Sequence, residues 1–500
     1  MSIEHFDVVI IGAGLSGIGA GYRLQTRCPR KRYVILEARE QIGGTWDLFR
    51  YPGVRSDSDM FTLAYPFRPW KGAKAIADGP AILNYVRDTA REFGIDRHIR
   101  FQQRVQSASW STEDGRWTLE VGDGAGKTRR YTCDFLYGCT GYYRYDSGYD
   151  PAFPGAERFR GPIVHPQHWP EDLEYSGKKV VVIGSGATAV TLVPAMASTA
   201  AHVTMLQRSP SYTLSLPHHD AVADWLRRNL PAGPAHRIAR WKNILISLGI
   251  YQLSRRAPDY MRRLLRTGAA KSLPTGYEVE KHFNPRYQPW DQRLCLVPDS
   301  DLFKAISKGR ASVVTDEVET FTEHGIRLQS GQELEADIIV TATGLQMLAL
   351  GAVRISVEGT PIHPGEAFAY KGTMLGNVPN FAFCIGYTNA SWTLRADLAS
   401  TFVCRVLRHM DRNGYRTCMP VCDSAMMESR PLLNLTSGYV MRAAADLPKQ
   451  ATAQPWMIQQ NYVLDMLTMK LSRMEDGILH FRKGIFLART AMPEKLATSA

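Results

Sequence analysis

Two glycine-rich turns constrain the fold of this chain more than any other feature. Gly12, Gly14 and Gly17 follow the apolar run at residues 8–11, and a second turn from Gly184 to Ala189 follows the apolar run at residues 180–183. A buried strand, a tight glycine turn and a helix, in this order, are typical of a dinucleotide-binding Rossmann unit. The sequence therefore predicts an α/β fold with two Rossmann-like units, each able to hold one nucleotide.

The length and composition agree with a multidomain globular protein. A chain of 500 residues is too long for one hydrophobic core, and 44% hydrophobic with 22% charged residues is an ordinary composition for a water-soluble fold. The chain has no uninterrupted run of the roughly 18 apolar residues that a membrane-spanning helix needs. The first predicted strand begins a few residues after Met1, which leaves no room for a signal peptide. We therefore expect a cytoplasmic protein.

The cysteines do not predict disulfides or a metal site. The 8 cysteines are scattered through the chain, unlike those of small disulfide-stabilised domains. Cys418 and Cys422 form the one close pair, and no second pair of Cys or His residues lies near them in the sequence to complete a zinc site. We expect reduced thiols and no metal.

The first unit has the features of an FAD site. Gly12 permits the tight turn, Gly14 lets the backbone approach a pyrophosphate, and Gly17 lets the helix pack closely. Glu37 ends the next strand, where a carboxylate binds ribose hydroxyls, and a second glycine pair ending at Gly44 follows soon after, which favours FAD over NAD. The candidate cofactor-binding residues of this unit are Gly12, Gly14, Ser16, Gly17, Glu37, Gly44, Thr45, Trp46, Asp47, Leu48, Arg55, Ser56, Asp57 and Val105.

The second unit has the features of an NADPH site. Its turn carries Ala189, a permitted small residue, where a third glycine is often found. The strand that follows ends with Arg208 instead of an acid, and an arginine at this position accommodates the 2′-phosphate of NADPH. The candidate cofactor-binding residues here are Gly184, Ser185, Gly186, Ala187, Thr188, Ala189, Val190, Arg208 and Ser209.

The two units are predicted to be nested in one another. The strand-and-turn stretch at residues 134–141 recurs in similar form at residues 337–344. The predicted division is residues 1–150 for the first part of the FAD-binding domain, 151–340 for the NADP-binding domain with a helical insertion at about 215–280, 341–490 for the return to the FAD domain and a C-terminal helical segment, and 491–500 for a mobile tail.

Much of the net charge of +12 is concentrated in residues 225–271. This segment holds eleven Lys and Arg residues against Asp259 alone, together with aromatic residues and the apolar run at 244–250. A solvated helical insertion is the favoured interpretation, and peripheral contact with a membrane surface is left open. No nucleic-acid-binding motif accompanies the charge, so we expect no nucleic-acid partner.

The stretch between the two units carries a more specific pattern. Phe159, Gly161, His165, Trp169 and Pro170 match every fixed position of the pattern Phe, any residue, Gly, three residues, His, three residues, Trp, then Pro or Asp. With this pattern between two dinucleotide turns, the sequence resembles the flavin-containing Baeyer–Villiger monooxygenases over nearly the whole chain. Among them it is most similar to the type that oxidises thioamide prodrugs such as ethionamide.

The resemblance implies FAD in the first unit, NADPH in the second and a structural role for His165. It also implies that Arg293 is the active-site arginine, which stabilises a negatively charged flavin peroxide, and that Asp57 is the acid that orients it and contacts the nicotinamide end. A permanent cation in a dry site is suited to this task because it stabilises an anion through charge-assisted hydrogen bonds. Many members have a basic residue before the arginine, whereas this chain has Gln292, so the NADPH preference depends more on Arg208.

The implied activity is NADPH- and O2-dependent conversion of a small-molecule ketone into an ester, with sulfides or thioamides as further substrates. Three alternatives remain open. The first is an N- or S-oxygenating flavin monooxygenase with little ketone activity, and the second is an FAD/NADPH reductase, against which the absence of a CxxC pair argues. The third is a membrane-surface role led by the basic segment.

Overall fold

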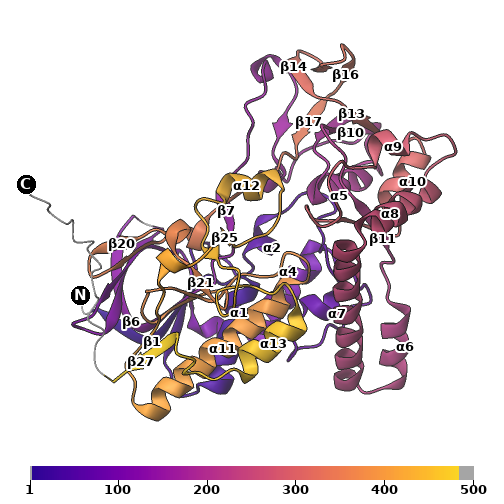
Figure 1. Cartoon of the computed structure of the whole chain (residues 1–500). Coiled ribbons are helices and arrows are strands. Elements are labelled where there is room, and N and C mark those ends of the chain that lie inside the picture. Colours follow the sequence, from indigo (N-terminus) through magenta and orange to yellow (C-terminus); the bar gives the residue numbers. More distant parts are fainter. Residues whose placement is uncertain (1–2, 125, 484–500) are drawn as a thin grey trace, which may run out of the picture.

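The first sheet begins at the N-terminus and is completed much later in the chain. A computed structural model describes residues 3–124 and 126–483, and within them this sheet has nine strands, in the order β20-β19-β4-β5-β6-β1-β2-β3 with β23 also paired to β6 (Figure 1). The strands are β1 (Glu4–Ile11), β2 (Tyr33–Leu36), β3 (Ile99–Arg100), β4 (Gln103–Ser111), β5 (Arg116–Asp123), β6 (Thr128–Gly138), β19 (Arg354–Val357), β20 (Thr360–Ile362) and β23 (Phe381–Phe383).

The second sheet is parallel throughout. In the described part of the chain it has five strands in the order β13-β10-β9-β17-β8, and it lies above and to the right of the first sheet in Figure 1. Its strands are β8 (Ile163–Val164), β9 (Lys179–Ile183), β10 (His202–Gln207), β13 (Ala311–Thr315) and β17 (Ile338–Thr341). Helices α5 (Ala187–Met196) and α10 (Asp301–Ser307) pack on it. The α/β fold with two nested Rossmann-like units is thereby confirmed.

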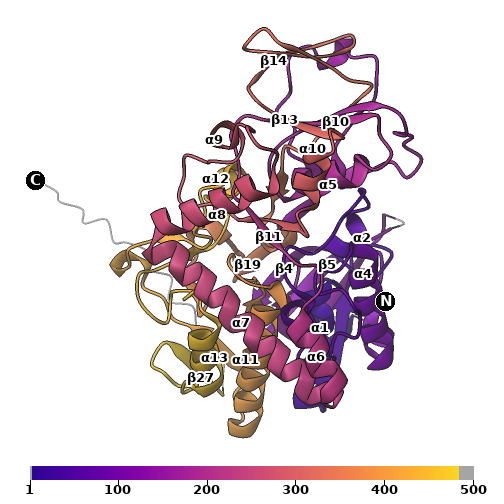
Figure 2. The same cartoon turned by 90° about the vertical axis from the view of Figure 1, so that its right-hand side faces the viewer.

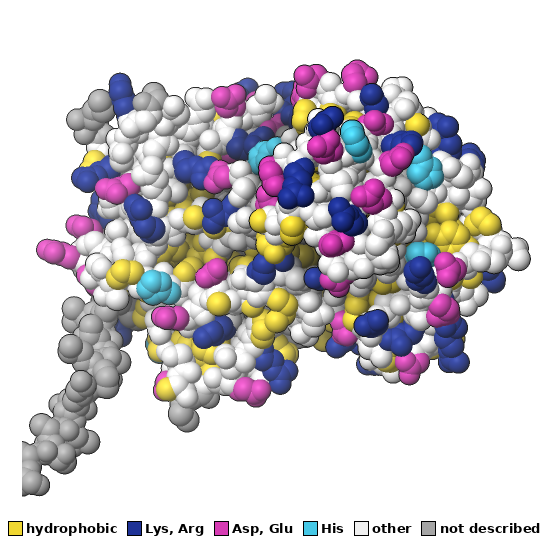
Figure 3. Space-filling model, turned by 90° about the horizontal axis from the view of Figure 1, so that it is seen from above, with side chains coloured by type: hydrophobic (Ala, Val, Ile, Leu, Met, Phe, Trp, Pro, Cys, Tyr) yellow, Lys and Arg dark blue, Asp and Glu magenta, His cyan; other side chains and the backbone are white. Residues whose placement is uncertain are grey.

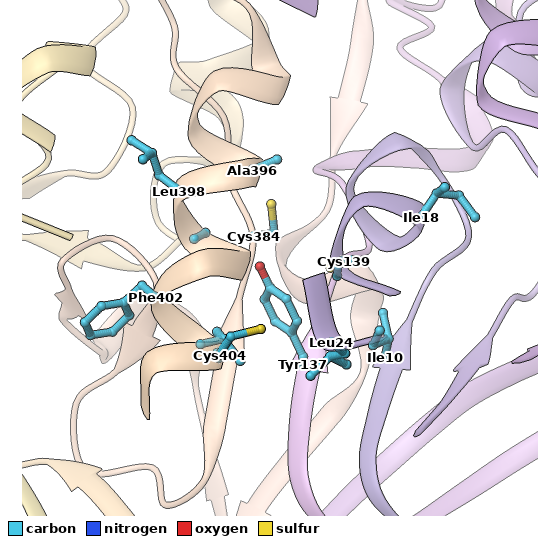
Figure 4. Packing of buried hydrophobic residues seen from close by; sticks show 14 of the residues in the cluster. Ile10, Ile18, Leu24, Tyr137, Cys139, Cys384, Ala396, Leu398, Phe402 and Cys404 are labelled. Atoms are coloured by element: carbon cyan, nitrogen blue, oxygen red, sulfur yellow. The ribbon is translucent and has the colours of Figure 1, made fainter. Parts of the chain in front are cut away.

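Long helices cover the first sheet. Helix α1 (Leu15–Arg27) packs against α11 (Trp392–Asn413), and α11 in turn packs against α13 (Tyr462–Leu471). Figure 4 shows Tyr137 of β6 between α1 and α11, and its hydroxyl lies 3.1 Å from Ser400 Oγ of α11. Sequence positions almost 400 residues apart therefore form one core, so the first unit cannot be assembled without the C-terminal third of the chain.

The remaining elements extend these layers. Helices α2 (Thr45–Leu48), α3 (Met60–Leu63), α4 (Gly79–Glu92) and α9 (Val279–His282) lie between sheet strands in sequence, and α12 (Gly438–Ala443) lies near the C-terminus. Small sheets pair β7 (Tyr143–Gly148) with β18 (Leu345–Met347), β11 (Thr213–Leu216) with β12 (Cys295–Pro298), β21 (Ala369–Tyr370) with β22 (Met374–Leu375), and β14 (Val318–Thr322), β15 (Gly325–Leu328) and β16 (Glu333–Glu335) with one another.

The segment after α11 is less helical than the sequence analysis predicts. Besides α12 and α13 it forms two short antiparallel pairs, β24 (Thr417–Pro420) with β27 (Leu479–Arg482) and β25 (Arg430–Pro431) with β26 (Lys449–Gln450). The expectation of a mainly helical C-terminal segment is therefore wrong. A proline lacks the backbone N–H that a helix interior needs, and this segment contains Pro420, Pro431, Pro448 and Pro455. The helices of the segment are therefore short. The predicted tail at residues 491–500 lies outside the described residues.

Residues 217–280 form a helical arm beside both units. Helix α6 (Ala221–Asn229) packs against α7 (Ala232–Arg256), which is followed by α8 (Pro258–Ser272), and all three face the viewer in Figure 2. Arg240 of α7 is buried and donates to the backbone carbonyls of Phe61, Thr62 and Ala64, which joins the arm to α3. In the described residues no helix is long and apolar enough to span a membrane.

Residues 159–170, which we call the connector, are held by close backbone contacts. Phe159 is buried in the core of the second unit, and a Cβ on Gly161 would lie only 2.2 Å from the carbonyl oxygen of Asp337. The His165 imidazole accepts from Gln167 N at 3.2 Å and lies 3.2 Å from the carbonyl oxygen of Gly344, so Nδ1 is the acceptor and Nε2 carries the proton. Burial lowers the pKa of His165, which keeps this neutral tautomer.

Replacing Gly161 by alanine should destabilise the second unit. The added methyl group would overlap the Asp337 carbonyl and the Phe159 ring, and overpacking of this kind costs about 1–3 kcal/mol of unfolding free energy. The shift of the urea midpoint measures the loss. Gly268→Ala is the matched control, because its Cβ meets no atom within 4 Å and α8 should gain up to about 1 kcal/mol. Equal midpoints for the two variants would contradict this account.

Candidate active site

A large cavity lies where the two units meet. Its volume is about 450 Å³, and its walls come from β1, α1, the loop after β2, the loop after β6 and the start of α5. Seen from above, the protein surface is hollowed near its centre, and hydrophobic side chains are visible in the hollow (Figure 3). The sequence-predicted residues that line the cavity are Gly12, Gly14, Ser16, Glu37, Gly44, Thr45, Trp46, Arg55, Asp57, Val105, Ala187, Thr188 and Arg293.

The first glycine turn brings backbone close to backbone. Gly12 has φ +103°, and a Cβ there would lie 2.7 Å from the carbonyl oxygen of Cys139. A Cβ on Gly17 would lie 1.9 Å from the carbonyl oxygen of Gly12, so helix α1 can begin directly behind the turn only with glycine at this position. No side chain of the described residues caps the first turn of α1, so its N–H groups are free for an anionic ligand.

Glu37 is held in place by the backbone around it. The carboxylate is buried and accepts from Ala13 N at 2.6 Å and from Arg39 N at 2.8 Å. These two bonds fix the carboxylate at the end of β2, on the cavity wall next to the glycine turn. Its remaining lone pairs can accept from the hydroxyls of a ribose.

Asp47 and Leu48 lie outside the cavity lining. The Asp47 carboxylate is buried and ion-paired with Arg39 at 2.6 Å, Arg87 at 3.0 Å and Arg50 at 3.1 Å. A buried carboxylate paired with three cations has a structural role, because it holds the turn at Gly43 and Gly44 against α4. Direct contact of Asp47 and Leu48 with a cofactor stays a prediction.

The loop after β2 also supplies Arg55, Ser56 and Asp57. Arg55 forms a bidentate ion pair with Asp301 at the start of α10, which ties the first unit to the second. Asp301 is not recognisable from the sequence, since an acid in the first turn of a helix is a common feature with no motif of its own. Ser56 is buried, donates to the carbonyl oxygen of Ser58 at 2.7 Å and does not reach the cavity wall.

Arg293 and Asp57 meet across the junction of the two units. Arg293 Nη1 donates to Asp57 Oδ2 at 2.7 Å, and Nη2 lies 3.5 Å from the carbonyl oxygen of Tyr387. Its Nε is buried and has no hydrogen-bond partner among the described residues. Burial disfavours the guanidinium charge, but Tyr142 and the Asp57 carboxylate outweigh it and raise the pKa of Arg293 well above its ordinary value. The guanidinium is thus a permanent cation on the cavity wall.

Aromatic side chains that the sequence analysis did not identify form much of the cavity wall. Trp392, at the start of α11, donates from Nε1 to Ser16 Oγ at 2.7 Å. The repeated tyrosines at residues 142–145, directly after the turn that ends β6, are the one local signal that could have pointed to them. Besides the predicted Trp46, the aromatic lining residues are Phe49, Tyr51, Tyr142, Tyr143, Tyr145 and Trp392.

The second glycine turn repeats the geometry of the first. Gly184 has φ +139°, and a Cβ there would lie 2.4 Å from the carbonyl oxygen of Ala342. Ser185 Oγ donates to the carbonyl oxygen of Ser209 at 2.9 Å. Arg208 is exposed, with no hydrogen bond or ion pair to the rest of the described chain, so its guanidinium is available to a ligand. The predicted residues beyond the cavity lining in this unit are Gly184, Ser185, Gly186, Ala189, Val190, Arg208 and Ser209.

The chain thus provides two cradles that fit dinucleotides. In each, a strand ends in a glycine turn that only a residue without Cβ can form, and an uncapped helix N-terminus follows. Glu37 directly follows the second strand of the first cradle, and Arg208 directly follows the second strand of the second cradle. Among the described residues no cluster of three His, Cys, Asp or Glu side chains could hold a metal ion.

Known proteins share these features. A family model described as flavin-binding monooxygenase-like matches residues 74–222, and one described as an NAD(P)-binding Rossmann-like domain matches residues 10–77. FAD-containing monooxygenase EthA of Mycobacterium tuberculosis is 54% identical over 481 residues, covering 96% of this chain and 98% of the relative. The chain belongs to the flavin-binding monooxygenases. This confirms the resemblance that the connector pattern indicates.

Further comparisons agree with this assignment. EthA of Mycolicibacterium smegmatis is also 54% identical to this monooxygenase over 481 residues, with the same coverage of 96% and 98%. Among solved structures, a steroid monooxygenase bound to NADP superimposes with a TM-score of 0.76 at 23% identity, covering 96% of this chain and 100% of that one. An open form of cyclohexanone monooxygenase gives 0.71 at 21% identity, with coverage of 84% and 91%. These two likenesses concern the fold.

Replacing Glu37 by glutamine should weaken flavin retention by this monooxygenase. The change removes the anionic acceptor at the ribose position and leaves one of two buried N–H groups facing an amide N–H, and each lost charge-assisted bond costs about 1.5–3 kcal/mol. We expect about tenfold less tightly bound flavin, measured by visible absorbance of the desalted protein. Glu40→Gln, three residues later on the surface, is the control and should retain flavin fully. Full retention in Glu37→Gln would refute the ribose assignment.

Proposed function

We propose that this monooxygenase is an FAD- and NADPH-dependent Baeyer–Villiger enzyme that inserts one oxygen atom from O2 beside the carbonyl of a ketone. The balanced reaction takes ketone, O2, NADPH and H⁺ to ester, NADP⁺ and water. The observation that carries the proposal is the Arg293–Asp57 pair, which sets a permanent cation on the cavity wall where the two dinucleotide cradles meet.

The cofactor assignment rests on the two cradles and on the relatives. FAD would lie in the first, with its pyrophosphate at the N-terminus of α1 and its ribose at Glu37, and NADPH in the second, with its 2′-phosphate at Arg208. The similar protein EthA is an FAD-containing monooxygenase by name, and the similar steroid monooxygenase structure holds NADP, which supports this assignment. When bound, FAD and NADPH together supply reducing equivalents and the means to activate O2.

Arg293 is proposed to stabilise negative charge that develops at the reacting oxygen atoms. Nη2 makes only a long contact of 3.5 Å within the protein, so its hydrogen-bonding capacity is still available to a ligand. Asp57 accepts from Nη1 and thereby fixes the orientation of the guanidinium plane. A preoriented cation in a site of low polarity stabilises an anion without reorganising during the reaction.

The aromatic wall is proposed to exclude water and to accept an apolar substrate. Tyr142, Tyr143 and Trp392 present mainly carbon surface to the cavity next to Arg293. Exclusion of water from the site would prevent side reactions such as hydrolysis and proton leakage during the reaction with O2. Sulfides and thioamides are proposed as further substrates, because a soft sulfur atom can attack an electrophilic oxygen without a charged intermediate on the substrate carbonyl.

Arg293→Gln should lower ester formation by about 10²–10³-fold, because removal of one preoriented charge-stabilising donor typically has this effect. Coupled NADPH oxidation and product analysis by mass spectrometry with a panel of ketones measure it. Arg104→Gln is the matched control, since Arg104 lines the same cavity but pairs with Asp146 at the surface and should retain activity.

Ketone and sulfur substrates separate the candidate functions. If Arg293→Gln loses ester formation and keeps sulfoxide formation, both activities use the site as proposed. Wild-type protein that forms sulfoxide but no ester over a broad ketone panel would establish the N- or S-oxygenating alternative instead. Ester formation at wild-type rate in Arg293→Gln would refute the proposed role of the arginine.

Arg208→Gln should raise the KM for NADPH by about tenfold or more and leave the KM for NADH unchanged, because a charge-assisted bond to the 2′-phosphate contributes about 1.5–3 kcal/mol. Steady-state kinetics with both nucleotides measure the change. Lys178→Gln provides the control, since Lys178 is also an exposed cation but lies just before the start of β9, at the end of the strand away from the glycine turn. Equal changes for the two nucleotides would show that Arg208 does not read the phosphate.

A further inference from the structure

The helical arm carries many large apolar side chains in solvent. In α6, α7, α8 and the turns between them these are Val222, Trp225, Leu230, Ile238, Trp241, Leu245, Ile246, Leu253, Tyr260 and Leu264, with exposed fractions of 36–59%. Single exposed apolar residues are ordinary, but a concentration of this kind on one arm marks an interaction surface.

On α7 the exposed apolar residues form a stripe. Ile238, Trp241 and Leu245 are spaced by three and four residues, so they lie on one side of the helix. The opposite side already buries His236, Ala239 and Arg240 against the protein. A helix that packs against its own protein normally has a polar outer face. The apolar outer face of α7 is therefore suited to contact with another molecule or surface.

Helix α13, more than 200 residues later, lies beside α7 and exposes apolar side chains of its own. The ring of Trp241 meets that of Tyr462 at 5.9 Å between centroids, so the two helices are neighbours. Leu464, Leu467 and Leu471 follow with the same helical spacing, and Leu471 is the most exposed large apolar side chain of the described residues, at 73%. We call Ile238, Trp241, Leu245, Leu464, Leu467 and Leu471 the apolar face.

Cations border the apolar face, and two of the three acids in residues 217–272 are already paired, whereas Asp259 at the start of α8 is exposed and forms no ion pair with a described residue. Helix α7 contains no acidic residue. Asp220, just before α6, is ion-paired with Lys242, and Asp224 in α6 is ion-paired with Arg227. The cations of α7, α8 and α13 that are exposed and form no ion pair with a described residue include Arg237 and Arg256 of α7, Arg263 of α8 and Lys470 of α13.

The structure also shows that the basic residues at 225–271 leave less free positive charge than their number in the sequence suggests. Several of the eleven cations there are engaged within the protein, including Arg240 in its buried bonds, Arg255 with Asp291 and Arg266 with Glu280. Arg262 donates to the hydroxyl of Tyr212. The free charge is therefore smaller than the sequence suggests, and the exposed apolar and aromatic side chains are the larger part of the surface.

We propose that the apolar face docks the protein onto the surface of an anionic lipid bilayer. Leucine, isoleucine and tryptophan side chains with flanking arginines and lysines are the composition of interfacial helices, which insert their apolar side roughly 5–10 Å into the headgroup region. The unpaired cations would lie at the depth of the lipid phosphates, where each adds about 1 kcal/mol of attraction. A second copy of the chain fits less well, because a twofold contact would set these cations against one another.

Vesicle flotation with the full-length, flavin-loaded protein tests the proposal. At low salt the protein should float with vesicles of phosphatidylcholine and phosphatidylglycerol, float less with phosphatidylcholine alone, and be released in part by high salt. Ile238→Gln combined with Leu245→Gln should lower the partition coefficient at least about tenfold, and Arg237→Gln with Arg256→Gln should do so for anionic vesicles only.

Matched variants separate this surface from general stickiness. Val421→Gln with Met441→Gln replaces two equally exposed apolar side chains outside the arm and α13 and should bind as the wild type does. All variants should keep NADPH oxidation, since none of these residues lines the cavity.

Three results would overturn the proposal. The first is no flotation with anionic vesicles at low salt, and the second is equal flotation of the Ile238→Gln, Leu245→Gln variant and the wild type. The third is a dimer in solution by light scattering that this variant dissociates while lipid binding is absent, which would assign the apolar face to a second copy of the chain.

Discussion

The site depends on the way the first sheet is completed from both ends of the chain. Strand β23 pairs with β6, and the Asn380 side chain just before β23 donates to the carbonyl oxygens of Asp134 and Arg416 and accepts from Cys418 N. Asn380 and Cys418 are buried, so the amide of one side chain satisfies three backbone groups at the place where β23 joins the sheet. The chain must leave the first unit, build the second and return, and this fixes where the second unit can stand.

That constraint explains why Arg293 and Asp57 can meet although 236 positions separate them. Arg293 belongs to the segment before β12, which follows the helical arm of the second unit. Asp57 belongs to the first unit and follows its turn at Gly43 and Gly44. The bidentate Arg55–Asp301 pair lies on the same boundary. The cavity wall is therefore an interface between units, and its charges are placed by the packing of both.

The sequence predicts the parts of the structure whose causes are local. Strand β1, the glycine turns and Glu37 follow from patterns within about 30 residues, because a turn of that shape needs glycine whatever surrounds it. The pairing of Arg293 with Asp57 required a family resemblance, because no local rule links them. Trp392 and Asp301 reach the junction only through tertiary packing, and the continuation of the apolar face onto α13 depends on one aromatic contact between distant segments. Propensity and periodicity carry no information of that kind.

The two chain segments that cross between the units are paired with each other. Strand β7 runs toward the second unit, β18 runs back, and they form one antiparallel ribbon in which Leu345 lies opposite Gly148. The His165 ring is stacked so close to Gly148 that a Cβ there would lie 2.0 Å from its Cε1, while its Nε2–H reaches the carbonyl oxygen of Gly344. The ribbon and the histidine of the connector therefore form one joint between the units, in which a side chain at residue 148 would displace the His165 ring and with it the contact to Gly344.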